Sequence, residues 1–177
     1  GEDMEKENYV SFFSEFMSES DRAAIVLGAA QMDDLLTSIL KKRLIAPNNG
    51  LFEFNGPYGT FSAKIDTAHA VGVIDKSFSN KINLIRKIRN QCAHNIQNLD
   101  LNSGGISQQI TELASSFSDT KFWEENLQEA GKEFNKEGNS LTLRLTIAML
   151  VANLAMINKK VQTIDNSSAF SIFTPAK

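Results

Sequence analysis

The chain has 177 residues, of which 42% are hydrophobic and 22% are charged, and its formal net charge is −3. This composition is typical of a globular protein and excludes a disordered or collagen-like chain. Proteins that bind duplex DNA directly carry a strongly basic footprint, so we expect only weak binding of this chain to duplex DNA. The single cysteine, Cys92, cannot form an internal disulfide, which favours a cytoplasmic location.

The predicted secondary structure is helical throughout. Only three prolines occur, and apolar residues recur at a period near 3.6 rather than alternating as in strands. Helices are expected over residues 8–17, 20–44, 60–72, 75–96, 106–117, 120–134 and 141–163. Ser20 is a good N-cap for the second of these helices, Thr60 or Ser62 could cap the third, and Asp75 or Ser77 opens the fourth. A loop over residues 46–59 separates the second and third helices, and its aromatic residues predict that it packs down on the fold.

The predicted fold class is all-α: a single-domain helical bundle of about seven helices around a central apolar C-terminal helix. We expect one domain over residues 1–177, with a core at about 19–99, a C-terminal helical part over 106–163 and a loose tail over 164–177. The longest apolar run, Leu145 to Ile157, is shorter than the roughly 20 residues that a membrane span needs. It therefore predicts a buried core helix, and no membrane association is expected.

The helix predicted over residues 75–96 carries the main candidate functional residues. Its core stripe consists of Ile82, Ile85, Ile88, Cys92 and Ile96 at spacings of three and four. Arg86, Asn90 and His94 form a row beside this stripe, and Arg89 lies between the row and the stripe. Arginine matches phosphate geometry and histidine titrates near neutrality, so the set could cleave RNA without a metal. The alternative is structural: Arg89 and His94 hold the loop over residues 51–61 in place.

The segment over residues 89–94, RNQCAH, resembles the signature of the HEPN superfamily. The resemblance implies a helical bundle, often dimeric, and a metal-independent ribonuclease. In that case Arg89 and His94 would be the catalytic pair and Asn90 a positioning group, and a homodimer would bring two such segments together.

Three further blocks resemble the mannitol operon repressor family, in the right order along the chain. They are SDRAAIVLGAA with MDDLL over residues 20–36, GTFSAKI over 59–65, and LIRKIRN with Ala93 and His94 over 84–94. The resemblance implies an all-helical bacterial regulator that lacks a recognisable DNA-binding motif. The chain departs from the family pattern at Cys92, where an aromatic residue is usual.

Four more residues are candidates for binding a ligand or anchoring a loop: Arg86, Lys64, Asp33 and Asp34. The two aspartates could bind a metal, pair with Arg86 or Arg89, or form a solvated acidic face. Two histidines without metal-binding spacing predict no metal site, and no cofactor is expected.

Three functions remain open on these residues. The first is a transcriptional regulator that acts through contacts with a protein partner. The second is the ribonuclease, with RNA as its substrate. The third is a sensor that binds a small phosphorylated ligand at the face of Arg86, Arg89 and His94.

Overall fold

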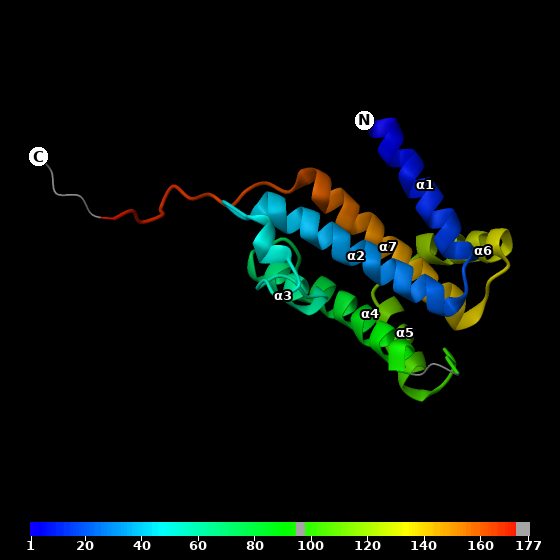
Figure 1. The fold of residues 1–177 in the computed structure, drawn as a ribbon. Coiled ribbons are helices and arrows are strands. Elements are labelled where there is room, and N and C mark those ends of the chain that lie inside the picture. Colours follow the sequence, from blue (N-terminus) through cyan, green and yellow to red (C-terminus); the bar gives the residue numbers. More distant parts are fainter. Residues whose placement is uncertain (95–97, 173–177) are drawn as a thin grey trace, which may run out of the picture.

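The computed structural model describes residues 1–94 and 98–172, and over these residues it contains seven α-helices and one short 3₁₀ helix, with no strand (Figure 1). In chain order they are α1 (Glu2–Ser18), α2 (Asp21–Arg43), η1 (Asn49–Phe52), α3 (Phe61–Ala70), α4 (Lys76–His94), α5 (Gly104–Ala114), α6 (Lys121–Phe134) and α7 (Gly138–Lys160). The all-helical class and the number of helices are therefore as predicted. The predicted end of the fourth helix, at Ile96, lies outside the described residues.

Four of these helices begin at a side-chain cap, and the caps of α3 and α4 are Thr60 and Asp75 rather than Ser62 and Ser77. The side-chain oxygens of Ser20, Thr60 and Thr120 accept hydrogen bonds from backbone N–H groups three residues later, at 3.1 to 3.2 Å. The Asp75 carboxylate accepts one from the Phe78 N–H at 2.8 Å in the same way. Each bond satisfies a donor that the first turn of a helix leaves without an intrahelical partner.

Two predicted helix boundaries differ from the structure for identifiable reasons. Helix α1 begins at Glu2 rather than at residue 8, because its polar first turns are rich in good helix formers such as Glu, Met and Lys. Helix α7 ends at Lys160 rather than at residue 163. Beyond it the Thr163 hydroxyl donates to the Lys42 carbonyl and the Ile164 N–H donates to the Arg43 carbonyl, which hold the chain in an extended form.

Helices α2 and α7 run parallel and side by side through the bundle (Figure 1). At their N-terminal ends the Ser140 hydroxyl donates to the Asp21 carboxylate at 2.5 Å, and at their C-terminal ends Lys42 Nζ donates to the Asn158 carbonyl at 2.7 Å. Gly28 lies at their contact, where a Cβ would stand 2.5 Å from Ile147 Cγ2. A glycine at this position therefore sets how closely the two helices approach.

The C-terminal helix has the central place that its apolar sequence predicts. Its buried apolar residues are Leu141, Leu143, Leu145, Ile147, Leu150, Val151 and Leu154. By length and hydropathy alone, α2 and α7 are the two described helices that could cross a membrane. About half of each such window (50% in α2 and 56% in α7) is buried inside the bundle, as in the core helix of a soluble fold.

Five helix ends are stabilised by a cation from a different helix. The last carbonyls of an α-helix lack intrahelical partners and carry partial negative charge, so they favour a positive side chain. The donor and acceptor pairs are Arg144 with Phe16 O (2.8 Å) for α1, Arg43 with Val71 O (3.0 Å) for α3, Arg22 with Cys92 O for α4, Lys81 with Leu113 O (2.7 Å) for α5, and Lys42 with Asn158 O (2.7 Å) for α7. We call these contacts the cross-helix caps.

Candidate functional site

Helix α4 places its predicted core stripe in the interior. Ile82, Ile85, Ile88 and Cys92 are buried, as their spacing predicts, whereas Ile96 lies outside the described residues. The same periodicity turns Arg86 and Asn90 toward half-buried positions and His94 toward solvent. The polar candidates are thus held on a helix that is firmly anchored by its apolar face.

Arg89 contacts two neighbours from its half-buried position. Its Nη2 donates to Asn90 Oδ1 at 3.1 Å, and its guanidinium carbon lies 5.5 Å from the centroid of the Phe61 ring at the start of α3. A guanidinium over an aromatic face is a favourable cation–π arrangement. Arg89 therefore contacts the last residue of the 51–61 segment, Phe61, through its aromatic ring.

His94 and Arg89 point in different directions from α4. Five residues separate them, which places their side chains about 140° apart around a helix axis. His94 is exposed at the last residue of the helix, and Asn90 lies one turn before it on the same side. One copy of the chain thus leaves the arginine and the histidine separated, and a shared substrate would have to bridge them or meet them from two copies.

Arg86 lies at the edge of a polar hollow of about 360 Å³ between α3, α4 and α5. Its Nε donates to Asn83 Oδ1 at 3.1 Å. Lys87 lines the same hollow, but so do the carboxylates of Asp66 and Glu112. These two negative charges oppose the binding of a phosphate beside Arg86.

The remaining candidates form an ion pair between α2 and α3. Lys64 Nζ lies 2.7 Å from Asp33 Oδ1, with the two side chains 8% and 30% exposed. Asp33 therefore pairs with Lys64 rather than with Arg86 or Arg89, while Asp34 is exposed. Among residues 1–94 and 98–172, no group of three or more histidine, cysteine, aspartate or glutamate side chains could hold a metal ion.

Cys92 is a buried thiol in the core stripe of α4. Burial raises the pKa of its thiol above the ordinary value, and the nearby positive charge of Arg22 opposes this rise without cancelling it. A thiol with a raised pKa carries little thiolate near neutral pH, so Cys92 is a packing residue rather than a nucleophile.

The most highly connected polar residue is one that the sequence did not single out. Arg144 lies on α7 and is 1% exposed. Its guanidinium donates to the carbonyls of Phe16 and Glu19, each at 2.8 Å, and to the Asp21 carboxylate at 2.9 Å. The one available signal was a lone arginine inside an otherwise apolar helix, where a charge must find several partners.

The loop between α2 and α3 is tightly wound. The Gly56 N–H donates to the Glu53 carbonyl at 2.7 Å, and the Tyr58 N–H donates to the Leu51 carbonyl at 2.8 Å. A Cβ on Gly56 would lie 2.3 Å from the Gly50 carbonyl oxygen, and one on Gly59 would lie 2.1 Å from that of Glu53. Only glycine allows these approaches, so the backbone path of the loop is closely fixed.

The aromatic residues of this loop differ in their exposure to solvent. Phe52 and Tyr58 are half-buried and pack on each other at 5.7 Å between ring centroids. Phe54, in contrast, is 90% exposed. The prediction that the loop packs down is therefore wrong for Phe54, because the turn that the glycines permit carries this residue outward.

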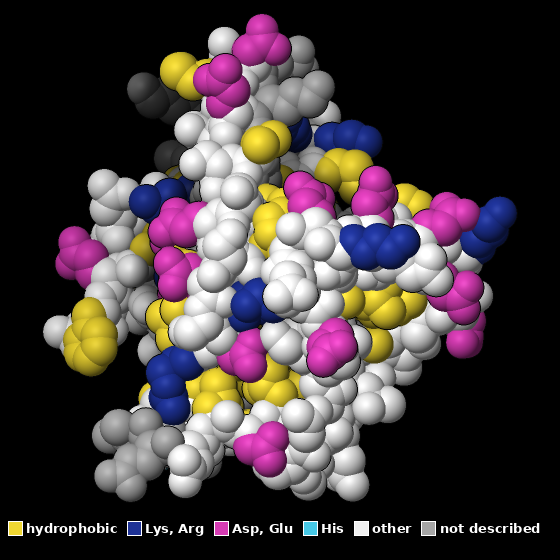
Figure 2. Space-filling view, turned by 90° about the vertical axis from the view of Figure 1, so that its right-hand side faces the viewer, with side chains coloured by type: hydrophobic (Ala, Val, Ile, Leu, Met, Phe, Trp, Pro, Cys, Tyr) yellow, Lys and Arg dark blue, Asp and Glu magenta, His cyan; other side chains and the backbone are white. Residues whose placement is uncertain are grey.

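The molecular surface carries both signs of charge. Figure 2 shows lysine and arginine side chains interspersed with aspartate and glutamate on the face seen from the right of Figure 1. A duplex-binding face would instead gather positive charge along one surface.

The chain matches no family model, and no curated protein matches it. Among solved structures, a chain in "X-ray structure of the MtlR-HPr complex from Escherichia coli" is similar, with a TM-score of 0.60 and 12% sequence identity. The alignment covers 82% of this chain and 99% of that one. At this identity the likeness establishes the fold: the chain has an MtlR-like helical architecture.

Proposed function

We propose that this chain is a regulator of the mannitol-repressor type that acts by binding another protein. The three sequence blocks and the MtlR-like fold support the regulator class, and that fold neighbour was solved as a complex with the protein HPr. The observation that carries the proposal is Phe54, a large aromatic side chain that is 90% exposed on a closely fixed loop.

Phe54 has the properties of an interface anchor. Burying a phenyl ring against a partner is favourable by roughly 1.5–3 kcal/mol, and aromatic residues are enriched at the centres of protein interfaces. The hydrogen bonds of Gly56 and Tyr58 order the loop before any partner arrives. Binding then loses little further conformational entropy, which is the advantage of a preorganised contact.

The electrostatics agree with a protein partner rather than duplex DNA. The net charge is −3, and acidic residues share the surface with basic ones (Figure 2). Mixed charge on this face and a negative net charge reduce the gain from counterion release that dominates affinity for duplex DNA.

The test is a calorimetric titration of HPr into the chain. The parent should bind, and Phe54→Ala should weaken binding at least tenfold while leaving the thermal unfolding midpoint unchanged. Phe122→Ala is the matched control, because Phe122 is 64% exposed on α6 and should be dispensable. No binding of HPr by the folded parent, or equal losses for both variants, would contradict the proposal.

A second candidate function is metal-independent RNA cleavage, favoured by the exposure of His94. An exposed imidazole at the end of α4 is accessible to a substrate and belongs to the side-chain type that most often acts as a general acid or base. Because Arg89 points elsewhere on the same helix, cleavage would require a homodimer that brings two copies of α4 together.

This second function has its own direct assay. The dimeric fraction would be incubated with single-stranded RNA in chelator, together with His94→Ala and Arg89→Ala. Chelator-resistant cleavage that both substitutions abolish would establish a ribonuclease. If the RNA stayed intact in every lane, the ribonuclease function would be excluded and the regulator function would remain.

A further inference from the structure

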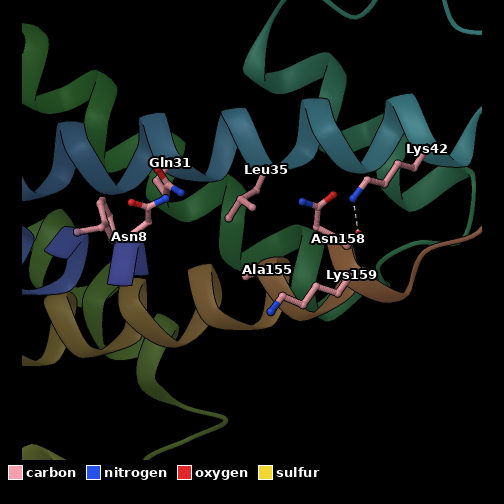
Figure 3. Close-up of a pocket in the computed structure, with 8 residues that line it drawn as sticks. Asn8, Gln31, Leu35, Lys42, Ala155, Asn158 and Lys159 are labelled. Carbon is pink, nitrogen blue, oxygen red and sulfur yellow. Dashed lines mark hydrogen bonds between the residues drawn. The ribbon is translucent and has the colours of Figure 1, made fainter. Parts of the chain in front are cut away.

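A groove of about 350 Å³ runs along the outer side of the α2–α7 pair, next to α1 (Figure 3). Apolar side chains of Phe12, Leu35 and Ala155 line it, and none of the lining residues that the structure describes is acidic. We propose that this groove binds a small amphipathic anion: an apolar body that carries a carboxylate or a phosphate at one end. The proposal is independent of the protein contact at Phe54.

The groove has two polar ends with an apolar stretch between them. Asn8 and Gln31 place their amides together at one end, and Lys42 lies over Asn158 at the other (Figure 3). Leu35 lies between the two ends (Figure 3). This order of groups suits an elongated ligand with a charged head, an apolar middle and a second polar group.

The anion would bind at the Lys42 and Asn158 end. Lys42 Nζ donates one hydrogen bond to the Asn158 carbonyl at 2.7 Å, and an ammonium has three such donors. Asn158 Oδ1 accepts from the Ser38 hydroxyl at 2.9 Å, which orients the amide so that its nitrogen points along the groove toward Leu35 (Figure 3). A cation and an oriented N–H donor thus face the same space.

The size and charge of the groove select the ligand class. A volume of about 350 Å³ is at the small end of the range for ligand sites, which fits a short aliphatic or single-ring body. Lys159 also lines the groove and points back toward Ala155 (Figure 3). Lys42 gives its end of the groove a positive charge, and the described lining residues include no carboxylate, so this end favours an anion over a cation.

The test uses three probes that share an eight-carbon body: octanoate, octyl phosphate and octylammonium, each below its micelle-forming concentration. Titrations of the full chain followed by amide NMR shifts should show saturable binding of the two anions, with shifts at α2 and α7. Octylammonium should bind at least tenfold more weakly. The tighter of the two anions identifies the natural head group.

Two pairs of variants locate the site. Lys42→Gln should weaken octanoate at least fivefold, whereas Lys41→Gln, which removes the same charge from the same turn outside the groove, should not. Ala155→Phe should abolish binding by filling the groove, whereas Ala152→Phe, at an exposed position on the same helix, should not. Equal binding of octylammonium, or unchanged binding by the folded Lys42→Gln and Ala155→Phe variants, would overturn the proposal.

Discussion

Two arginines of this chain occupy opposite kinds of environment. Arg144 is buried at the α1–α2 junction. Its guanidinium donates hydrogen bonds to the carbonyls of Phe16 and Glu19 and to the carboxylate of Asp21. Arg89 is half-buried, and among the described residues it makes one side-chain hydrogen bond, to its chain neighbour Asn90, and one cation–π contact, with the ring of Phe61. The comparison teaches that the arginine in a recognisable motif need not be the arginine that stabilises the fold.

The difference follows from the acceptors available to each side chain. Arg144 faces the end of a helix, where several carbonyls have no intrahelical partner. Arg89 faces the side of α3, where backbone carbonyls are already bonded within the helix, so a ring face is what remains. Substitutions at the two sites should therefore differ several-fold in their effect on stability.

The largest effect is expected for Arg144→Ala. It would remove the guanidinium from several buried carbonyls and from the Asp21 carboxylate, a loss of about 3–5 kcal/mol in the free energy of unfolding. Urea unfolding followed by circular dichroism would measure it. Arg144→Lys should recover only part of the loss, because one ammonium cannot reproduce the spread of a guanidinium. A loss below that of Arg89→Ala would contradict the expected order of the two arginines.

Lys81→Met should have the next largest effect, and that effect should depend on pH. Lys81 Nζ donates to the Leu113 carbonyl at 2.7 Å, so its removal should cost about 1–2 kcal/mol at neutral pH. Burial lowers the pKa of Lys81 below 10.5, and Glu112 partly opposes this shift. The unfolded chain thus binds more protons, and the free energy of unfolding of the parent should rise as the pH increases toward 10.5.

The control for this prediction is the variant itself. Lys81→Met lacks the titrating group, so the parent should gain stability relative to it over the same alkaline interval. Urea midpoints measured at several pH values would show the two curves diverging. Parallel curves would mean that Lys81 titrates alike in the folded and unfolded chains.

Arg89→Ala should have a smaller effect, about 0.5–1.5 kcal/mol. The substitution removes one side-chain hydrogen bond and the contact with Phe61, both at a half-buried position. Thermal unfolding would measure it, with Arg89→Lys retaining part of the ring contact. An unchanged unfolding midpoint would mean that Arg89 has no structural role, and the ribonuclease would gain support.

The smallest effect is expected for His94→Ala, within about 0.5 kcal/mol, because the imidazole is exposed at a helix end. The same thermal measurement applies. A loss comparable to that of Arg89→Ala would show that His94 holds the loop over residues 51–61 in place, as the structural alternative predicts.

Local signals predicted most of the fold. Ser20, Thr60 and Thr120 mark helix starts because each cap bond closes within three residues. The burial of α7 follows from an apolar run too continuous for a surface helix. Both kinds of signal lie within a few residues of the feature that they predict.

The site was less predictable, because its contacts join distant parts of the chain. The partners of Arg144 at the α1–α2 junction lie more than 120 residues away, and the partner of Lys64 lies 31 residues away. Periodicity places a side chain on a face but does not say which element meets that face. The outward position of Phe54 likewise depends on how Gly56 and Gly59 wind the loop, which an aromatic-rich sequence does not reveal.

The cross-helix caps bear on the order in which the chain acquires structure during synthesis. Helix α1 is synthesised before the other described helices, yet the guanidinium that bonds its Phe16 carbonyl is made 128 residues later. Helix α2 supplies the cations for α3, α4 and α7 through Arg43, Arg22 and Lys42, so those helices can dock as soon as they emerge. Among the described helices, α1 therefore receives its cap late, although it is made before the others.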